Sequence, residues 1–154
     1  MDYSALRTLL ESGGGWRQHL ARGHVRRIIL SLMGPTSDRL FLDFSVRKLT
    51  QLSERIGDCL GRLTGEQVWA RGGESENAVG NLVLHLCGNV RQWIVSGVGG
   101  KPDIRDRDRE FAARGGVDPA ELSKRLGTAV AEAVAVIEQV TPERLLETVT
   151  PQAY

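Results

Sequence analysis

The sequence predicts an all-α protein: an up-down helical bundle in which three long helices are present. Three segments repeat apolar residues at alternating three- and four-residue steps, which is the spacing of an amphipathic helix. No segment shows the strict apolar-polar alternation of a half-buried strand. A chain of 154 residues is long enough to form one domain with a substantial core.

Residues 1–37 differ in composition from the rest. They hold five arginines, a run of three glycines and two of the three histidines, His19 and His24. Three interpretations are open: a basic arm for nucleic acid or lipid, an ordered helix, or a loose tail ahead of a natural start at Met33. We favour the last; a basic arm is disfavoured because the segment is short and shows no regular pattern of aromatic residues among the basic ones. The expected domains are therefore a basic, poorly ordered or short-helical extension at 1–37 and a helical domain at 38–154.

The first long helix is expected to begin at Ser37 or Asp38, either of which can cap it. One apolar stripe runs along it, and charged residues lie between the stripe positions. The stripe comprises Leu42, Ser45, Leu49, Leu52, Ile56, Cys59 and Leu63. After it, the segment from Glu66 to Trp69 predicts a short helical turn.

The second long helix is predicted at 77–97, with Ser75 or Asn77 as its cap. It is apolar almost all round, yet it carries one histidine, His85. Buried helices seldom carry an ionisable group unless that group is paired or bound. We expect the core-facing stripe to be Leu82, His85, Leu86, Asn89 and Trp93, with Val79, Val83, Val90 and Ile94 on the flank.

The loop at 101–116 is the most charged part of the chain, and the third long helix follows it. The loop residues Arg105, Asp106, Arg107, Asp108, Arg109 and Glu110 are expected to form a solvated surface. The functional alternative is that they line the mouth of the bundle. Asp118 and Pro119 give the third helix a strong start signal, and Pro142 ends it before a short turn through Leu146.

Composition narrows the class of protein. A net charge of +1 gives no reason to expect a nucleic-acid partner for the whole chain, and no apolar run approaches the ~20 residues of a membrane span. Cys59 and Cys87 are expected to be free, buried thiols in a reducing compartment. The sequence thus favours a cytoplasmic protein that binds neither nucleic acid nor membrane. Trp69 and Trp93 are expected to be core anchors.

Segments 63–69, 77–93 and 105–111, taken together, resemble the DinB-like superfamily of four-helix-bundle proteins, and are closest to an uncharacterised branch of it. The resemblance implies a divalent metal (Zn, Ni or Fe) held by three histidines, one on the second helix and two at i and i+4 on the fourth. His85 takes the first position, but no His-x-x-x-His pair occurs in the sequence. We therefore expect the chain to be truncated at its C-terminus, with the fourth helix missing and the metal site incomplete.

His85 is thus either a metal ligand or a satisfied core histidine, with Asn81 and Asn89, one turn to either side, as its expected hydrogen-bond partners. The resemblance implies a metal-binding protein in its complete form, with thiol transferase or hydrolase activity by analogy only; whether the chain is an enzyme stays open, and its small-molecule substrate is unidentified. The alternatives are a non-catalytic helical module that dimerises or packs on a partner through its open helix faces, or a fragment without function.

Overall fold

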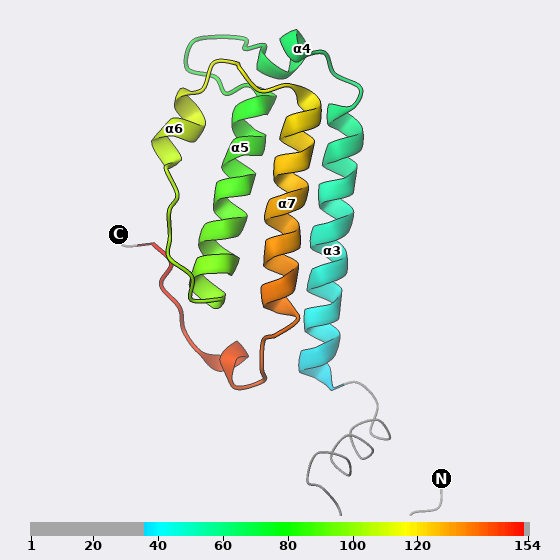
Figure 1. Cartoon of the computed structure of the whole chain (residues 1–154), viewed down its shortest axis with the longest axis vertical. Coiled ribbons are helices and arrows are strands. Elements are labelled where there is room, and N and C mark those ends of the chain that lie inside the picture. The colour runs from blue at the N-terminus through cyan, green and yellow to red at the C-terminus, as the bar shows by residue number, and fades with distance from the viewer. Residues whose placement is uncertain (1–35, 153–154) are drawn as a thin grey trace, which may run out of the picture. The chain divides into compact units, whose positions relative to one another are not determined.

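A computed structural model describes residues 36–152 of the chain. The chain divides into two units between residues 36 and 37, and the second unit is the subject here. The prediction of a basic extension at 1–37 lies outside the described residues, apart from its last two positions. Within residues 36–152 every regular element is a helix (Figure 1), which confirms the all-α class.

The three predicted long helices are all present. They are α3 (Ser37–Leu60), α5 (Val79–Val90) with its continuation η2 (Arg91–Val98), and α7 (Pro119–Ile137). The continuation η2 is a π-helix, an uncommon wider turn. The shorter elements are α4 (Gly65–Trp69), α6 (Arg107–Ala112) and the 3-10 turn η3 (Arg144–Leu146). Helix α6 lies in the segment that the sequence predicts to be a loop.

Helix α7 packs between α3 and α5, and α6 packs on the opposite flank of α5 (Figure 1). Gly57, near the end of α3, faces Ser123, near the start of α7, so these two helices are antiparallel. Helices α5 and α7 instead run in the same direction, and Arg91 pairs with Glu132 between them at 2.7 Å. The strict up-down alternation therefore fails at this step, because the segment 99–118 is long enough to return along α5 before α7 begins.

The core lies where α4, α5 and α7 meet the end of α3. Its buried residues are Leu60, Val68, Val83, Cys87, Leu122, Leu126, Ala129 and Val130. Helix α5 thus faces the core with Val83, which was expected on the flank, and with Cys87. Leu82, Leu86 and Trp93, which were expected in the core, are 48%, 38% and 39% exposed. The prediction for this face is wrong because a helix that is apolar all round does not indicate which side meets its neighbour.

Helix α7 starts where the sequence signals predict, whereas helix α5 does not. Helix α7 begins as predicted, and the Asp118 side chain accepts a hydrogen bond from the Glu121 amide at 2.8 Å. Helix α5 begins after Ala78 rather than after Ser75 or Asn77. There, the Asn81 side chain accepts a hydrogen bond from the Ala78 amide at 3.1 Å, so a residue inside the first turn replaces the expected cap.

The two tryptophans and the two cysteines do not behave alike. Trp69 packs against the core and donates a hydrogen bond from its indole to the Val117 carbonyl at 2.8 Å, as expected of an anchor. Cys87 is buried, whereas Cys59 is exposed, and both are free thiols. None of the helices in residues 36–152 combines the length and apolar character needed to cross a bilayer.

Candidate functional site

Asn81 fixes the position of α6 on α5. This side chain is fully buried, and its amide nitrogen donates to the carbonyl oxygens of Glu110 and Ala113, both at 2.9 Å. Its oxygen accepts from the Arg71 guanidinium at 2.5 Å as well as from the Ala78 amide. A buried amide with every polar atom satisfied holds its partners in a single arrangement. The start of α5 and the end of α6 are therefore held in fixed register.

His85, Glu110 and Arg105 form a compact cluster beside this anchor. His85 Nδ1 lies 3.1 Å from Glu110 Oε2 and 2.9 Å from Arg105 Nη2. The Arg105 guanidinium grips Glu110 in a fork, with 2.8 Å from Nε to Oε1 and 2.8 Å from Nη2 to Oε2. The side chains of Arg105 and Glu110 are only 4% and 10% exposed, whereas His85 is 28% exposed. A buried ion pair thus holds one edge of a more accessible imidazole.

The tautomer of His85 depends on which neighbour its Nδ1 serves. If Nδ1 carries the proton, it donates to Glu110, and Nε2 is left with a free lone pair. If Nδ1 is bare, it accepts from Arg105, and the proton sits on Nε2. Glu110 already accepts two hydrogen bonds from Arg105, and this hydrogen bonding raises the pKa of the Arg105 guanidinium. The cluster therefore retains its charge pair in both tautomers.

Gly88 makes room for the charge pair. A Cβ built at this position would overlap Glu110 Oε1 and come within 2.8 Å of Arg105 Nε. The ion pair consequently lies directly against the backbone of α5, one turn after His85. Any larger residue would push the pair away from the imidazole.

An outer layer of polar contacts supports Arg105. Gln92 Oε1 accepts a hydrogen bond from Arg105 Nη1 at 2.8 Å and another from Gln152 Nε2 at 2.6 Å. The Gln92 amide nitrogen donates to Asp103 at 2.6 Å, and this bond lowers the pKa of Asp103. Gln92 therefore holds the Arg105 guanidinium, and Asp103 and Gln152 hold Gln92.

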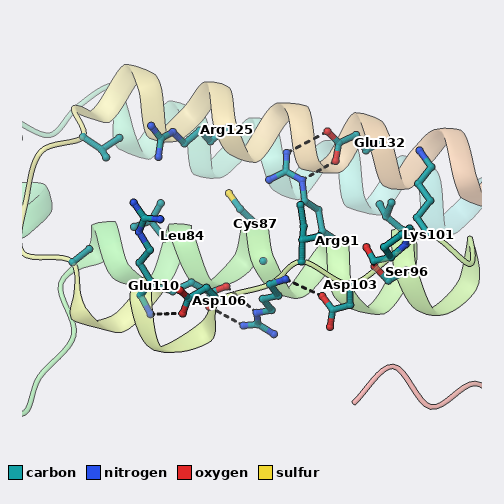
Figure 2. Close-up of a pocket in the computed structure, with 18 of the residues that line it drawn as sticks. Leu84, Cys87, Arg91, Ser96, Lys101, Asp103, Asp106, Glu110, Arg125 and Glu132 are labelled. Carbon is teal, nitrogen blue, oxygen red and sulfur yellow. Dashed lines mark hydrogen bonds and ion pairs between the residues drawn. The ribbon is translucent and has the colours of Figure 1, made fainter. Parts of the chain in front are cut away.

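A pocket of about 1040 Å³ lies on the other side of the charge pair, between α5, α7 and the segment 101–117 (Figure 2). In Figure 2 the Cys87 sulfur points into the space between α5 and α7, with Arg91 and Arg125 to either side of it. Burial raises the pKa of the Cys87 thiol, although both arginines act in the opposite direction. The thiol therefore stays protonated at neutral pH and forms part of the pocket wall.

The structure brings some of the predicted site residues together and separates others. Among residues 36–152, neither Asn81 nor Asn89 has a hydrogen bond to His85; Asn81 binds the backbone of α6 instead. The two charged residues that do reach His85, Arg105 and Glu110, are buried. The expectation of a solvated loop is thus wrong for these two, because α6 folds back onto α5.

The other members of the charged segment have surface roles. Asp106 caps α6 by accepting a hydrogen bond from the Arg109 amide at 3.0 Å, and the Arg107 guanidinium lies 5.4 Å from the centre of the Phe111 ring. Asp108 lies in the first turn of α6, where a negative charge is favourable. Gln92 and Gly88 were not predicted as site residues, and no sequence signal marks either of them.

Within the described residues, His85 is the side chain that could hold a metal ion, and Glu110 could support it through a hydrogen bond. Metal-bound histidines commonly present one ring nitrogen to the ion and hold a carboxylate with the other, which is the arrangement that Glu110 allows at His85. However, no three His, Cys, Asp or Glu side chains in residues 36–152 lie close enough together to hold an ion. The cluster fits part of a metal centre and does not complete one within this part of the chain.

A comparison with protein families matches residues 37–153 to the model described as "Protein of unknown function (DUF1572)". The chain belongs to this family. The DUF1572 segment begins with α3 and takes in every element of Figure 1, including the cluster around His85. No curated protein and no solved structure matches the chain significantly.

Proposed function

We propose that this DUF1572 protein binds a divalent metal ion through Nε2 of His85. The observation that carries the proposal is the 3.1 Å contact between His85 Nδ1 and Glu110 Oε2. In the tautomer in which Nδ1 donates to this carboxylate, the Nε2 lone pair is free and the imidazole is a better ligand. The resemblance of residues 77–93 and 105–111 to the DinB-like superfamily supports the same role for His85.

Arg105 positions Glu110 in this proposal. Its forked grip fixes both carboxylate oxygens, so Oε2 stays directed at the imidazole. Because the arginine neutralises Glu110, the cluster does not itself attract a second cation. Gln92 and Asn81 in turn hold the two elements that carry the pair.

The remaining ligands would come from water, a bound small molecule or a second copy. An imidazole ligand suits zinc, nickel and iron alike, so the donor does not select one of them. A thiol transferase or hydrolase reaction at such a centre rests on the family resemblance alone. The same proposal places the protein in the cytoplasm, where the free thiols of Cys59 and Cys87 would remain reduced.

Calorimetric titration of tag-free protein with Zn²⁺, Ni²⁺ and Fe²⁺ tests the proposal. We expect at least one of these ions to bind, His85→Gln to abolish that binding, and Glu110→Gln to weaken it about 10- to 100-fold. A His19→Gln/His24→Gln double variant is the control, and it should bind like the wild type. Wild-type binding below about a tenth of an equivalent, or retained binding in His85→Gln, would contradict the proposal.

A second candidate function is a helical module that forms a homodimer. Large apolar residues are exposed on three elements: Phe41, Phe44 and Leu52 on α3, Leu82 and Leu86 on α5, and Trp93 on η2. Apolar surface of this kind marks interaction sites in soluble proteins, and a second copy would bury it. This role requires no metal.

Sedimentation equilibrium over a range of protein concentrations distinguishes this role. We expect a reversible dimer that Phe44→Glu dissociates. Leu146→Glu is the matched control, because Leu146 is 88% exposed and belongs to η3 rather than to α3 or α5. A wild-type protein that is monomeric at all concentrations, or equal effects of the two variants, would exclude the dimer through α3.

A further inference from the structure

The pocket between α5, α7 and the segment 101–117 shares Arg105 and Glu110 with the proposed metal site, but it does not include the imidazole. His85 is not among its lining residues, and the Arg105–Glu110 pair separates the two. At about 1040 Å³ it is large enough for a small organic molecule. Its apolar wall includes Leu84, Val95 and Val117.

The carboxylates of the pocket are already engaged. Glu132 accepts from Arg91, Glu110 from Arg105, Asp103 from Gln92, and Asp106 from the Arg109 amide. The fork from Arg91 holds the pKa of Glu132 below its usual range, so that carboxylate stays ionised. Negative charge in the pocket is therefore matched by groups that are fixed in place.

Several cationic donors of the pocket, by contrast, are unused within residues 36–152. Arg125 pairs with Glu121 through Nε at 2.9 Å, and its two terminal nitrogens make no hydrogen bond in this part of the chain. Arg91 binds Glu132 through Nε and Nη2, which leaves Nη1. Lys101 also lines the pocket and forms no ion pair within the same range. Figure 2 shows Arg91 and Arg125 on facing helices, on either side of Cys87.

We propose that this pocket binds a small organic anion, whose carboxylate or phosphate lies between Arg91 and Arg125 and whose apolar body packs on Leu84 and Val95. Guanidinium groups recognise both headgroups through charge-assisted hydrogen bonds. The site uses neither His85 nor a metal, so it goes beyond the proposed function.

Calorimetric titration of the full chain in EDTA with octanoate, octyl phosphate and 1-octanol tests this site. We expect at least one of the two anions to bind about tenfold or more tightly than the neutral alcohol, and the tighter of the two identifies the headgroup. Arg125→Gln should weaken anion binding about tenfold or more and leave octanol unchanged. Lys124→Gln is the matched control, since Lys124 is the neighbouring cation on α7, 78% exposed, and does not line the pocket.

A second variant, Ile104→Glu, leaves the residues of α5 and α7 unchanged. Ile104 lines the pocket and is 89% exposed, so Ile104→Glu adds a negative charge without disturbing the core. Ile104→Glu should weaken the binding of the two anions and leave the binding of octanol unchanged. Octanol binding as tightly as both anions, or Arg125→Gln behaving like Lys124→Gln, would overturn the proposal.

The result of the anion-binding test can be distinguished from the result of the metal-binding test. His85→Gln should bind the anionic probe like the wild type, because the imidazole lies beyond the Arg105–Glu110 pair. Loss of anion binding in His85→Gln, with Arg125→Gln unaffected, would place the anion at the histidine and overturn this site. Failure of metal binding alone leaves the expected anion result unchanged.

Discussion

At the scale of single residues, the missing side chain at Gly88 allows Arg105 and Glu110 to cross α5 and reach His85. Glycine is normally a weak choice inside a helix, because its backbone loses more freedom on folding. Here the close approach of a charge pair to the backbone explains it. Gly127 on α7 differs, since a Cβ there would meet nothing within 4 Å.

We expect Gly88→Ala and Gly127→Ala to have opposite effects on stability. Gly88→Ala should lower the free energy of unfolding by about 1–3 kcal/mol, because the methyl group overlaps the Glu110 carboxylate. Gly127→Ala should raise it by up to about 1 kcal/mol through helix propensity. Urea denaturation measures both, and a stabilising Gly88→Ala would show that the charge pair moves aside freely.

The two cysteines are expected to differ in reactivity. Cys59 is exposed and Cys87 is buried, and burial raises the pKa of the Cys87 thiol. Because the thiolate is the nucleophile, iodoacetamide at pH 8 should alkylate Cys59 at least about tenfold faster. Mass spectrometry of timed samples identifies the site, and faster labelling of Cys87 would contradict the burial of this part of α5.

At the scale of the elements, α6 depends on Asn81 more than on apolar packing. None of its residues is fully buried, and its last turn is held by the Asn81 amide through the carbonyls of Glu110 and Ala113. The placement of Glu110 beside His85 is therefore set by a residue one turn earlier on α5. Asn81 supports the histidine indirectly, through the backbone of α6.

Asn81→Ala should lower the free energy of unfolding by about 1–3 kcal/mol, because it leaves buried carbonyl groups without donors. It should also speed hydrogen exchange in residues 107–113. Asn89→Ala is the control, since the Asn89 side chain makes no hydrogen bond within residues 36–152, and it should change neither quantity appreciably. Equal effects of the two variants would mean that α6 is held by something other than the Asn81 amide.

At the scale of the whole molecule, the parallel pairing of α5 and α7 is carried in part by Arg91 and Glu132. Nε and Nη2 of Arg91 reach the two oxygens of Glu132 at 2.7 and 3.3 Å. Arg144 adds a second link, donating to the carbonyls of Gly97 and Val98 at the end of η2. A cation at a helix C-terminus is favourable there. Arg144 thus links the segment after α7 to the end of η2.

The Arg91–Glu132 pair should make stability depend on pH at the acid end. The hydrogen bond from Arg91 holds the pKa of Glu132 below its ordinary value of 4.5. Its contribution is therefore present above that value and is lost as the pH falls through the lower, folded-state pKa. Both side chains are more than a third exposed, so solvent screening limits the contribution to below about 1 kcal/mol.

Thermal or urea unfolding of the wild type and of Glu132→Gln measures this dependence. We expect the wild type to be more stable at pH 7, and the difference to shrink as the pH falls below 4.5. Glu54→Gln on α3 is the control and should leave the profile parallel to that of the wild type. A difference that grows towards acid pH would show that Glu132 is destabilising when ionised.

Local signals predict the helices well, and they predict the contacts of the site poorly. Asp118 and Pro119 mark the start of α7 because a cap depends only on neighbours in the sequence. The charged run at 105–110 has no such local signature for burial. Arg105 and Glu110 become buried only because α6 returns to α5.

The sequence alone determined the helical class, the three long helices and the singular position of His85, because the period of apolar residues and the capping residues are local properties of the chain. The tertiary structure decided which side of α5 meets the core, the parallel direction of α7 and the partners of His85. These features depend on the path of the segment 99–118 in space. Only that path brings Glu110 within 3.1 Å of the imidazole and forms a pocket on the far side of the same ion pair.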